Sequence, residues 1–351
     1  SDDGCKMTSG GGKMADFSAE WRRWLLARLA AERAHLLFQM RGLGEETLTS
    51  APVSGKMTAR DVLLHVANWD AVNSERLSLT LDGRHREILP VANVDEANEE
   101  LHGRFQSIPL EQAVAASLKE RSGFLAALER LPDDLLHRRL ALSGGRRIHP
   151  RTWARWRFQH DAAHAQDILA WRQTQPRDAL RQIGPKFLLR AQLKATRREI
   201  LSLVAVVPPD ERIQRPVCGV WTLKDLLGHL TDWEKVGVEG LRQLVDEQTP
   251  EFGQTITDFD VFNAANAAAR MDQSWEVVWA DFTATRQSLL ALVDELPEPA
   301  LARPFQAPWG STVSAYTWLL VWMGHDHEHA IDVRHALGVS GWPNYLTRHG
   351  R

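Results

Sequence analysis

The chain carries the same sequence pattern twice. Residues 58–70 read TARDVLLHVANWD and residues 222–234 read TLKDLLGHLTDWE, with five of thirteen positions identical at an offset of 164. Residues 152–168 and 317–333 share seven of seventeen positions at an offset of 165, including the string His-Asp-x-x-His-Ala-x-Asp. One inserted residue therefore aligns the two halves. Because this period is too long for a solenoid repeat, it predicts two tandem copies of one domain.

The domain boundary is expected in a short segment that interrupts the helical pattern. Residues 173–186 contain Pro176 and then Gly184-Pro185. The length of 351 residues is about twice that of a usual single domain. We therefore predict a flexible Gly- and Ser-rich tail over residues 1–13, a first domain over residues 14–175 and a second domain over residues 176–351.

Both halves have the periodicity of amphipathic helices. Apolar residues recur at three- and four-residue spacing near the start, at Phe17, Trp21, Trp24, Leu25 and Leu29. Thr58 with Asp61, and Thr222 with Asp225, are capping boxes that predict the start of a second helix in each half. Residues 110–131 and 275–296 predict a long third helix that ends at Leu-Pro. The expected fold is all-α, with two tandem up-and-down bundles of four or five helices each.

Composition excludes several classes of function. The net charge of −3 argues against a nucleic-acid partner, and no apolar stretch approaches the roughly 20 residues of a membrane span. The two cysteines, Cys5 and Cys218, cannot form a disulfide framework. We expect a cytoplasmic protein that acts on a small molecule, with no nucleic acid and no membrane as partner.

Six of the fourteen histidines occupy matched positions in the two halves. In each half one histidine lies in the second helix and two more lie four residues apart on a later helix, so the latter two share one helix face. Three imidazoles from facing helices can hold one metal ion and leave coordination positions open. The candidate ligands are His65, His160 and His164 in the first half, and His229, His325 and His329 in the second.

Matched polar and aromatic residues surround these histidines. Four aspartates are candidates to accept a hydrogen bond from the ligand imidazoles: Asp161, Asp167, Asp326 and Asp332. Four further residues are candidates to line a substrate pocket: Trp69, Asn98, Trp233 and Asn263. His327 lies about 200° round the helix from His325 and is excluded as a ligand. Cys218, matched by Ser54, is interpreted as a loop thiol, and no matched Cys, Ser or Lys nucleophile is expected beside the ligands.

At these residues the sequence resembles the DinB-like (YfiT-type) helical-bundle superfamily. The string His229-Leu230-Thr231-Asp232-Trp233-Glu234, the later His-x-x-x-His pair and the stretch Asp260–Asn263 carry the resemblance. It implies a divalent metal, zinc or nickel, on His65/His160/His164 and on His229/His325/His329. It also implies thiol-dependent transferase or isomerase chemistry with a low-molecular-weight thiol. Because members of this family pair as dimers, the tandem chain is expected to build a pseudo-dimer within one polypeptide and to be a monomer.

Three classes of function remain open at this point. The first is a metal-dependent enzyme that transfers a thiol to a small electrophilic molecule. The second is a metal-dependent hydrolase, because His-Asp-x-x-His is one methylene shorter than the His-Glu-x-x-His motif of zinc peptidases. The third is a non-catalytic protein of the resistance type that binds or sequesters a small molecule.

Overall fold

The computed structural model describes residues 11–105 and 107–338, with side chains from Glu20 onward. The helices of the first half are α1 (Gly11–Phe38), α2 (Glu45–Ser50), α3 (Ala59–Leu81), η1 (His85–Glu87), α4 (Val94–Phe105), α5 (Leu110–Arg130), α6 (Asp133–His137), η2 (Ser143–Gly145) and α7 (Pro150–Gln173). Those that follow are η3 (Arg177–Leu180), α8 (Lys186–Val206), η4 (Glu211–Ile213), α9 (Leu223–Val245), α10 (Phe259–Arg270), α11 (Trp275–Glu295), η5 (Glu298–Ala302) and α12 (Ala315–Ala336). The expected tail lies outside the described residues up to residue 10, and its last three residues form the first turn of α1.

Three short antiparallel hairpins connect the helices within the described part of the chain. They are β1 (Leu140–Ala141) with β2 (Arg147–Ile148), β3 (Pro216–Cys218) with β4 (Trp221–Thr222), and β5 (Pro304–Gln306) with β6 (Thr312–Ser314). The first and third hairpins lead directly into α7 and α12. None of the described helices is both long and apolar enough to cross a membrane.

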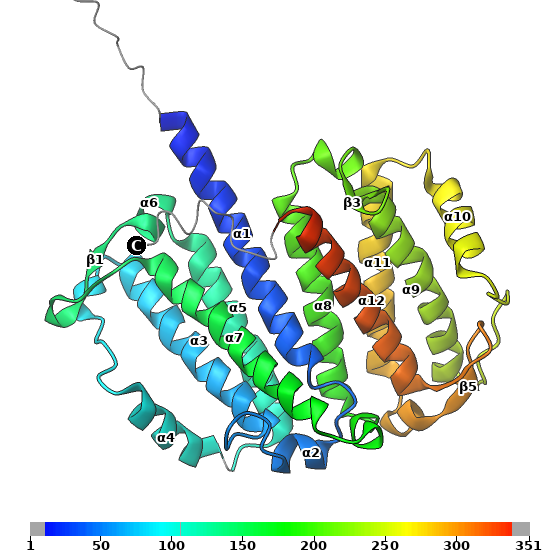
Figure 1. The fold of residues 1–351 in the computed structure, drawn as a ribbon, viewed down its shortest axis with the longest axis horizontal. Helices are drawn as coiled ribbons and strands as arrows, with labels where there is room; N and C mark the ends of the chain where they lie inside the picture. The colour runs from blue at the N-terminus through cyan, green and yellow to red at the C-terminus, as the bar shows by residue number, and fades with distance from the viewer. Residues whose placement is uncertain (1–10, 106, 339–351) are drawn as a thin grey trace, which may run out of the picture.

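Each half is a four-helix bundle, as the sequence predicts. The first bundle consists of α1, α3, α5 and α7, and the second of α8, α9, α11 and α12 (Figure 1). The shorter helices α4 and α10 lie at the outer ends of the molecule (Figure 1). Segment η3 lies between α7 and α8, in the region expected to link the domains. The prediction of two tandem all-α bundles is confirmed.

The expected capping boxes form at the start of α3 and α9. The Thr58 hydroxyl accepts from the backbone N–H of Asp61, and the Asp61 carboxylate accepts from the backbone N–H of Thr58. Thr222 and Asp225 make the same pair of bonds. Such caps satisfy backbone donors that the first helical turn leaves free, and each contributes about 1 kcal/mol. They fix the position along each helix from which His65 and His229 project.

The two bundles share a hydrophobic core through α1 and α8. Trp24 and Ala27 of α1 pack in one buried cluster with Leu203 and Val204 of α8. Near the other end of α1, the Gln192 side chain of α8 donates to the backbone carbonyl of Leu37 at 2.8 Å. These contacts make α1 and α8 antiparallel neighbours at the centre of the molecule (Figure 1). Because the first helix of each copy meets its counterpart, the chain forms the intramolecular pseudo-dimer expected from its sequence.

Candidate metal centres and the first-half cavity

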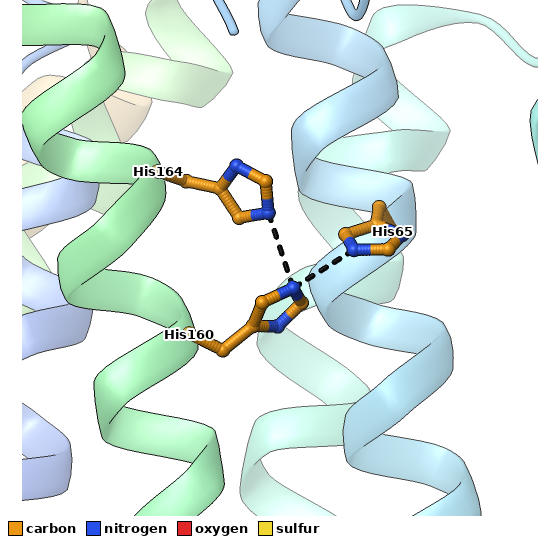
Figure 2. A group of neighbouring side chains, drawn as sticks. All are labelled: His65, His160 and His164. Carbon is orange, nitrogen blue, oxygen red and sulfur yellow. Dashed lines mark hydrogen bonds between the residues drawn. The ribbon is translucent and has the colours of Figure 1, made fainter. Parts of the chain in front are cut away.

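Three histidines from two helices converge in the first half. His65 projects from α3, and His160 and His164 project from successive turns of α7 (Figure 2). The Nε2 atom of His160 lies 2.8 Å from that of His65 and 3.1 Å from that of His164. The ring centroids lie 4.6 to 5.3 Å apart. All three rings therefore turn the same nitrogen toward one point.

The second half repeats this arrangement. His229 of α9 and His325 of α12 bring their Nε2 atoms to 2.9 Å. The ring centroid of His329 lies 5.1 Å from that of His229 and 4.8 Å from that of His325. The structure thus brings together all six histidines that the sequence matched between the halves, in two groups of three.

Five of these six imidazoles have pKa values that burial lowers, so they are neutral at ordinary pH. Burial, which disfavours the charged form, lowers the pKa of His65 and of His325 to about 3 and that of His229 to about 4. Burial likewise holds the pKa values of His160 and His164 below the usual range, and neighbouring Arg157 lowers them further. Neutral imidazole is the form that binds a metal ion.

The donor set in each half fits a divalent transition metal. In the first half, Nε2 of His160 faces Nε2 of His65 and Nε2 of His164. A neutral imidazole nitrogen carries either one proton or one lone pair, so it can form a hydrogen bond with only one of the two. The three rings therefore cannot fully satisfy one another by hydrogen bonding. The ligand atoms of each group lie within 4.8 Å of one another. Imidazole nitrogens suit zinc and nickel, and three such ligands leave coordination positions open.

The last histidine of the first group is oriented by a serine and an aspartate. Ser54 Oγ lies 3.0 Å from Nδ1 of His164 and donates to Asp167 Oδ2 at 2.6 Å. The Asp167 carboxylate itself is 3.8 Å from the ring nitrogen, so it acts through the hydroxyl. This chain of bonds favours a proton on Nδ1 and leaves Nε2 of His164 free to bind a cation.

In the second half the aspartate contacts the ring directly. Asp332 Oδ2 lies 3.0 Å from Nδ1 of His329, and Cys218 Sγ lies 3.4 Å from the same oxygen. The interpretation of Cys218 as a loop thiol is wrong, because Cys218 ends strand β3 and the β3–β4 hairpin places it beside His329. The expectation of no matched Ser or Cys beside the ligands was wrong for the same reason, since Ser54 occupies the equivalent position. Burial raises the pKa of Cys218 to about 11, with Asp332 contributing, so it is a protonated thiol.

Asp161 has a different role from the one expected. Its carboxylate accepts from Arg33 at 3.0 Å and from Arg121 at 2.7 Å, and both arginines also bind Asp70 at 2.9 Å. Burial alone would raise the pKa of Asp161, but the two guanidinium groups outweigh it and lower the pKa. The hydrogen bonds of this carboxylate therefore go to arginines rather than to the histidines. It fixes α7 against α1 and α5.

Asp326 lies in the matching buried cluster of the second half. Its carboxylate accepts from Arg197 at 3.0 Å and pairs with Arg286 at 2.8 Å. Glu234 takes the place of Asp70 and binds the same two arginines. Each half thus contains a buried square of two arginines and two acids directly behind its histidines.

The four predicted pocket residues form two matched pairs. The indole N–H of Trp69 donates to the Asn98 side chain at 3.2 Å, and that of Trp233 donates to Asn263 at 2.8 Å. These bonds attach α4 to α3 and α10 to α9. All four residues line hollows that also contain a ligand histidine of their own half. His327, which the helical angle excluded, packs on another face against Glu199 and His35.

A cavity opens beside the first group of histidines. Its volume is about 430 Å³, and His65, His160, Trp69 and Asn98 are among its lining residues. The corresponding hollow over His229 measures about 20 Å³. There, Arg270 pairs with both Asp232 and Asp281. A wider groove of about 830 Å³ reaches His229 and His325 from the boundary between the halves.

One residue of the first cavity escaped sequence reasoning. Arg157, one turn before His160, is only 6% exposed, and its NH1 lies 3.1 Å from Nδ1 of that ring. Burial lowers the pKa of Arg157 to about 10, with Asp70 and Asp161 opposing this effect, so the side chain stays charged. The alignment of the two halves carried a signal for this residue, because a charged residue in the first half is matched by Trp322 in the second. The arginines behind the histidines also carried a signal, since Arg33 matches Arg197.

Comparison with known proteins identifies the repeated unit. The sequence profile of the DinB superfamily matches the chain twice, over residues 28–168 and residues 192–332. Each match contains one complete group of three histidines. No curated protein and no solved structure gives a significant match. Proteins of this superfamily often bind metal.

Proposed function

The chain belongs to the DinB superfamily, and on this basis we propose that it is a divalent-metal-dependent enzyme that transfers a low-molecular-weight thiol to a small electrophile. The observation that carries the proposal is the convergence of three imidazoles in each half, with Nε2 atoms 2.8 and 2.9 Å apart at the closest pairs. We assign His65, His160 and His164 to one ion and His229, His325 and His329 to a second. The proposal takes residues 14–175 and 176–351 as the two catalytic domains.

The chain prepares these ligands through their outer nitrogens. Asp332 holds the proton of His329 on Nδ1, and Ser54 with Asp167 does the same for His164. A bound zinc or nickel ion supplies a Lewis acid that lowers the pKa of a thiol or water molecule. The hydrogen-bonded Trp69–Asn98 pair lines the cavity beside the first group.

Two observations support an external thiol as the reacting group. Cys218 holds its proton and occurs in the second half only, because the matching residue of the first half is Ser54. The aspartates of the His-Asp-x-x-His motifs are engaged by arginines, so Asp161 and Asp326 are poorly placed to serve as the base of a peptidase-like hydrolysis. In the transfer, a bond forms between the thiol sulfur and an electrophilic carbon, the bond to the leaving group breaks, and the thiol proton passes to the buffer.

Turnover of 1-chloro-2,4-dinitrobenzene tests this proposal. With glutathione, mycothiol or bacillithiol supplied in turn, chloride release is expected with at least one thiol and to require both zinc or nickel and that thiol. The double variant His160→Ala/His325→Ala is expected to lose activity, whereas Cys218→Ser and the exposed control His335→Ala retain it. Ester or amide hydrolysis without thiol would favour the hydrolase instead. Turnover that survives removal of metal and of all six histidines would contradict both enzyme proposals.

A further inference from the structure

The cavity of the first half combines apolar lining residues with basic ones. Trp153, Trp156 and Ile148 are among its apolar lining residues, and Arg76, Arg146 and Arg157 are its charged ones. No acidic side chain of the described chain lines it. Its volume of about 430 Å³ lies in the range of pockets that enclose small organic molecules.

Arg157 is a buried cation with an incomplete set of partners. Its side chain is 6% exposed, its Nε has no hydrogen-bond partner in the described chain, and its NH1 lies 3.1 Å from His160 Nδ1. The guanidinium carbon lies 5.7 Å from the centre of the Trp69 ring, which lines the same cavity. A buried guanidinium without a hydrogen-bonded anion costs free energy, because burial removes its hydration.

The surrounding charges do not neutralise it. Asp70 and Asp161 are already shared by Arg33 and Arg121, two acids with two arginines. The net charge of these four side chains is zero, and Arg157 therefore adds one uncompensated positive charge to the buried cluster. Arg76 adds to this excess, since its NH1 donates to the neutral Asn73 side chain and it lines the cavity together with Arg146.

The second half supplies an internal comparison. There the square of Arg197, Arg286, Glu234 and Asp326 is balanced. Trp322 replaces Arg157, and its side chain is buried in the hydrophobic core of that half. The unbalanced charge is a feature of the first half and not a requirement of the fold.

We propose that this cavity binds an aromatic carboxylate. The carboxylate accepts hydrogen bonds from Arg157, with Arg76 and Arg146 adding positive potential, because a planar guanidinium matches a carboxylate in two parallel bonds. The ring lies against Trp153 and Trp156. That this carboxylate is the electrophilic substrate of the first centre rests on the proposed function, whereas its binding requires no metal.

A matched pair of probes tests the inference. Binding of 2-naphthoate and of neutral 2-naphthamide is measured by calorimetry on the full chain, metal-free and zinc-loaded. Naphthoate is expected to bind the first half at least tenfold more tightly than the amide in both forms. Arg157→Gln is expected to weaken naphthoate at least tenfold without weakening the amide, and Arg157→Lys to weaken it less. Arg76→Gln, at a half-buried position, is expected to weaken it several-fold and provides a second test should Arg157→Gln not fold.

Arg270→Gln is the control, because this arginine of the second half already has Asp232 and Asp281 as partners; naphthoate affinity is expected to stay unchanged. Equal affinity for acid and amide, or naphthoate binding unaffected by both Arg157→Gln and Arg76→Gln, would overturn the inference. Zinc content is measured on the same samples. Selective naphthoate binding to protein that takes up no zinc would reject the proposed function but support the aromatic-carboxylate site. Zinc uptake without selective naphthoate binding would reject the aromatic-carboxylate site but leave the proposed function in place.

Discussion

The Nε2 atoms of His65 and His160 lie 2.8 Å apart, although 95 positions of sequence separate the two residues. The equivalent atoms of His229 and His325 lie 2.9 Å apart across 96 positions. Neutral imidazoles would meet at such a distance through one shared proton, but a third ring faces the same point in each half. A cation resolves this crowding, which is why we interpret both groups as metal centres.

The carboxylate behind His329 is expected to strengthen metal binding. Asp332→Asn replaces a charged acceptor of the Nδ1 proton with a neutral one, so zinc affinity of the second centre should fall about 10- to 100-fold. Competition with a chromophoric chelator measures this in a His164→Ala background, where the second centre is seen alone. The exposed Asp260→Asn provides the control. Equal affinity for the two variants would show that Asp332 does not act through the ring.

The metal-free protein is expected to lose stability as the pH falls below about 6.5. The folded-state pKa values of His65 and His229 are about 3 and 4. Below pH about 6.5 these histidines therefore bind protons in the unfolded chain but not in the folded one, which favours unfolding. Their contribution is intact above pH 6.5 and is lost as the pH falls toward 4. Glu32, whose pKa burial raises, opposes this trend. The melting temperature between pH 7 and pH 4 measures the effect.

A shallower pH dependence is expected for the double variant His65→Asn/His229→Asn, because asparagine does not titrate. The exposed His335→Ala should behave like the unaltered chain. A melting temperature independent of pH between 7 and 4.5 would show that these rings are protonated in the folded state.

The buried ion clusters are expected to be sensitive to loss of one partner. Asp161→Ala leaves Arg33 and Arg121 with one acid between them, and should lower the free energy of unfolding by about 3–5 kcal/mol. Glu100→Ala, which removes an exposed pair with Arg104, should cost less than about 1 kcal/mol. Urea unfolding measures both. A cost for Asp161→Ala as small as that of the control would remove the structural role assigned to the cluster.

Local signals made much of the fold predictable. The capping boxes at Thr58 and Thr222 and the histidine spacing depend on neighbours within one helix, and the offset of about 165 residues transferred each assignment to the other half. The matched histidines could also be placed together, because bundle helices face one another across a core.

The partners of the charged residues could not be predicted in this way. Asp161 sits beside His160 in the sequence, but a helix directs neighbouring side chains to different faces, and its carboxylate meets Arg33 and Arg121 from two other helices. Cys218 reaches His329 only because the β3–β4 hairpin folds over the end of α12. The cavity around Arg157 likewise depends on segments far apart in the chain.

The metal content of tag-free protein purified without a metal-affinity step tests the central claim most directly. After loading with zinc or nickel and removal of excess, the account predicts two ions per chain. His164→Ala and His329→Ala should each retain one, the double variant none, and the exposed control His335→Ala two. A double variant that keeps both ions, or an unaltered chain that binds neither metal, would contradict the assignment of the two histidine groups as metal centres.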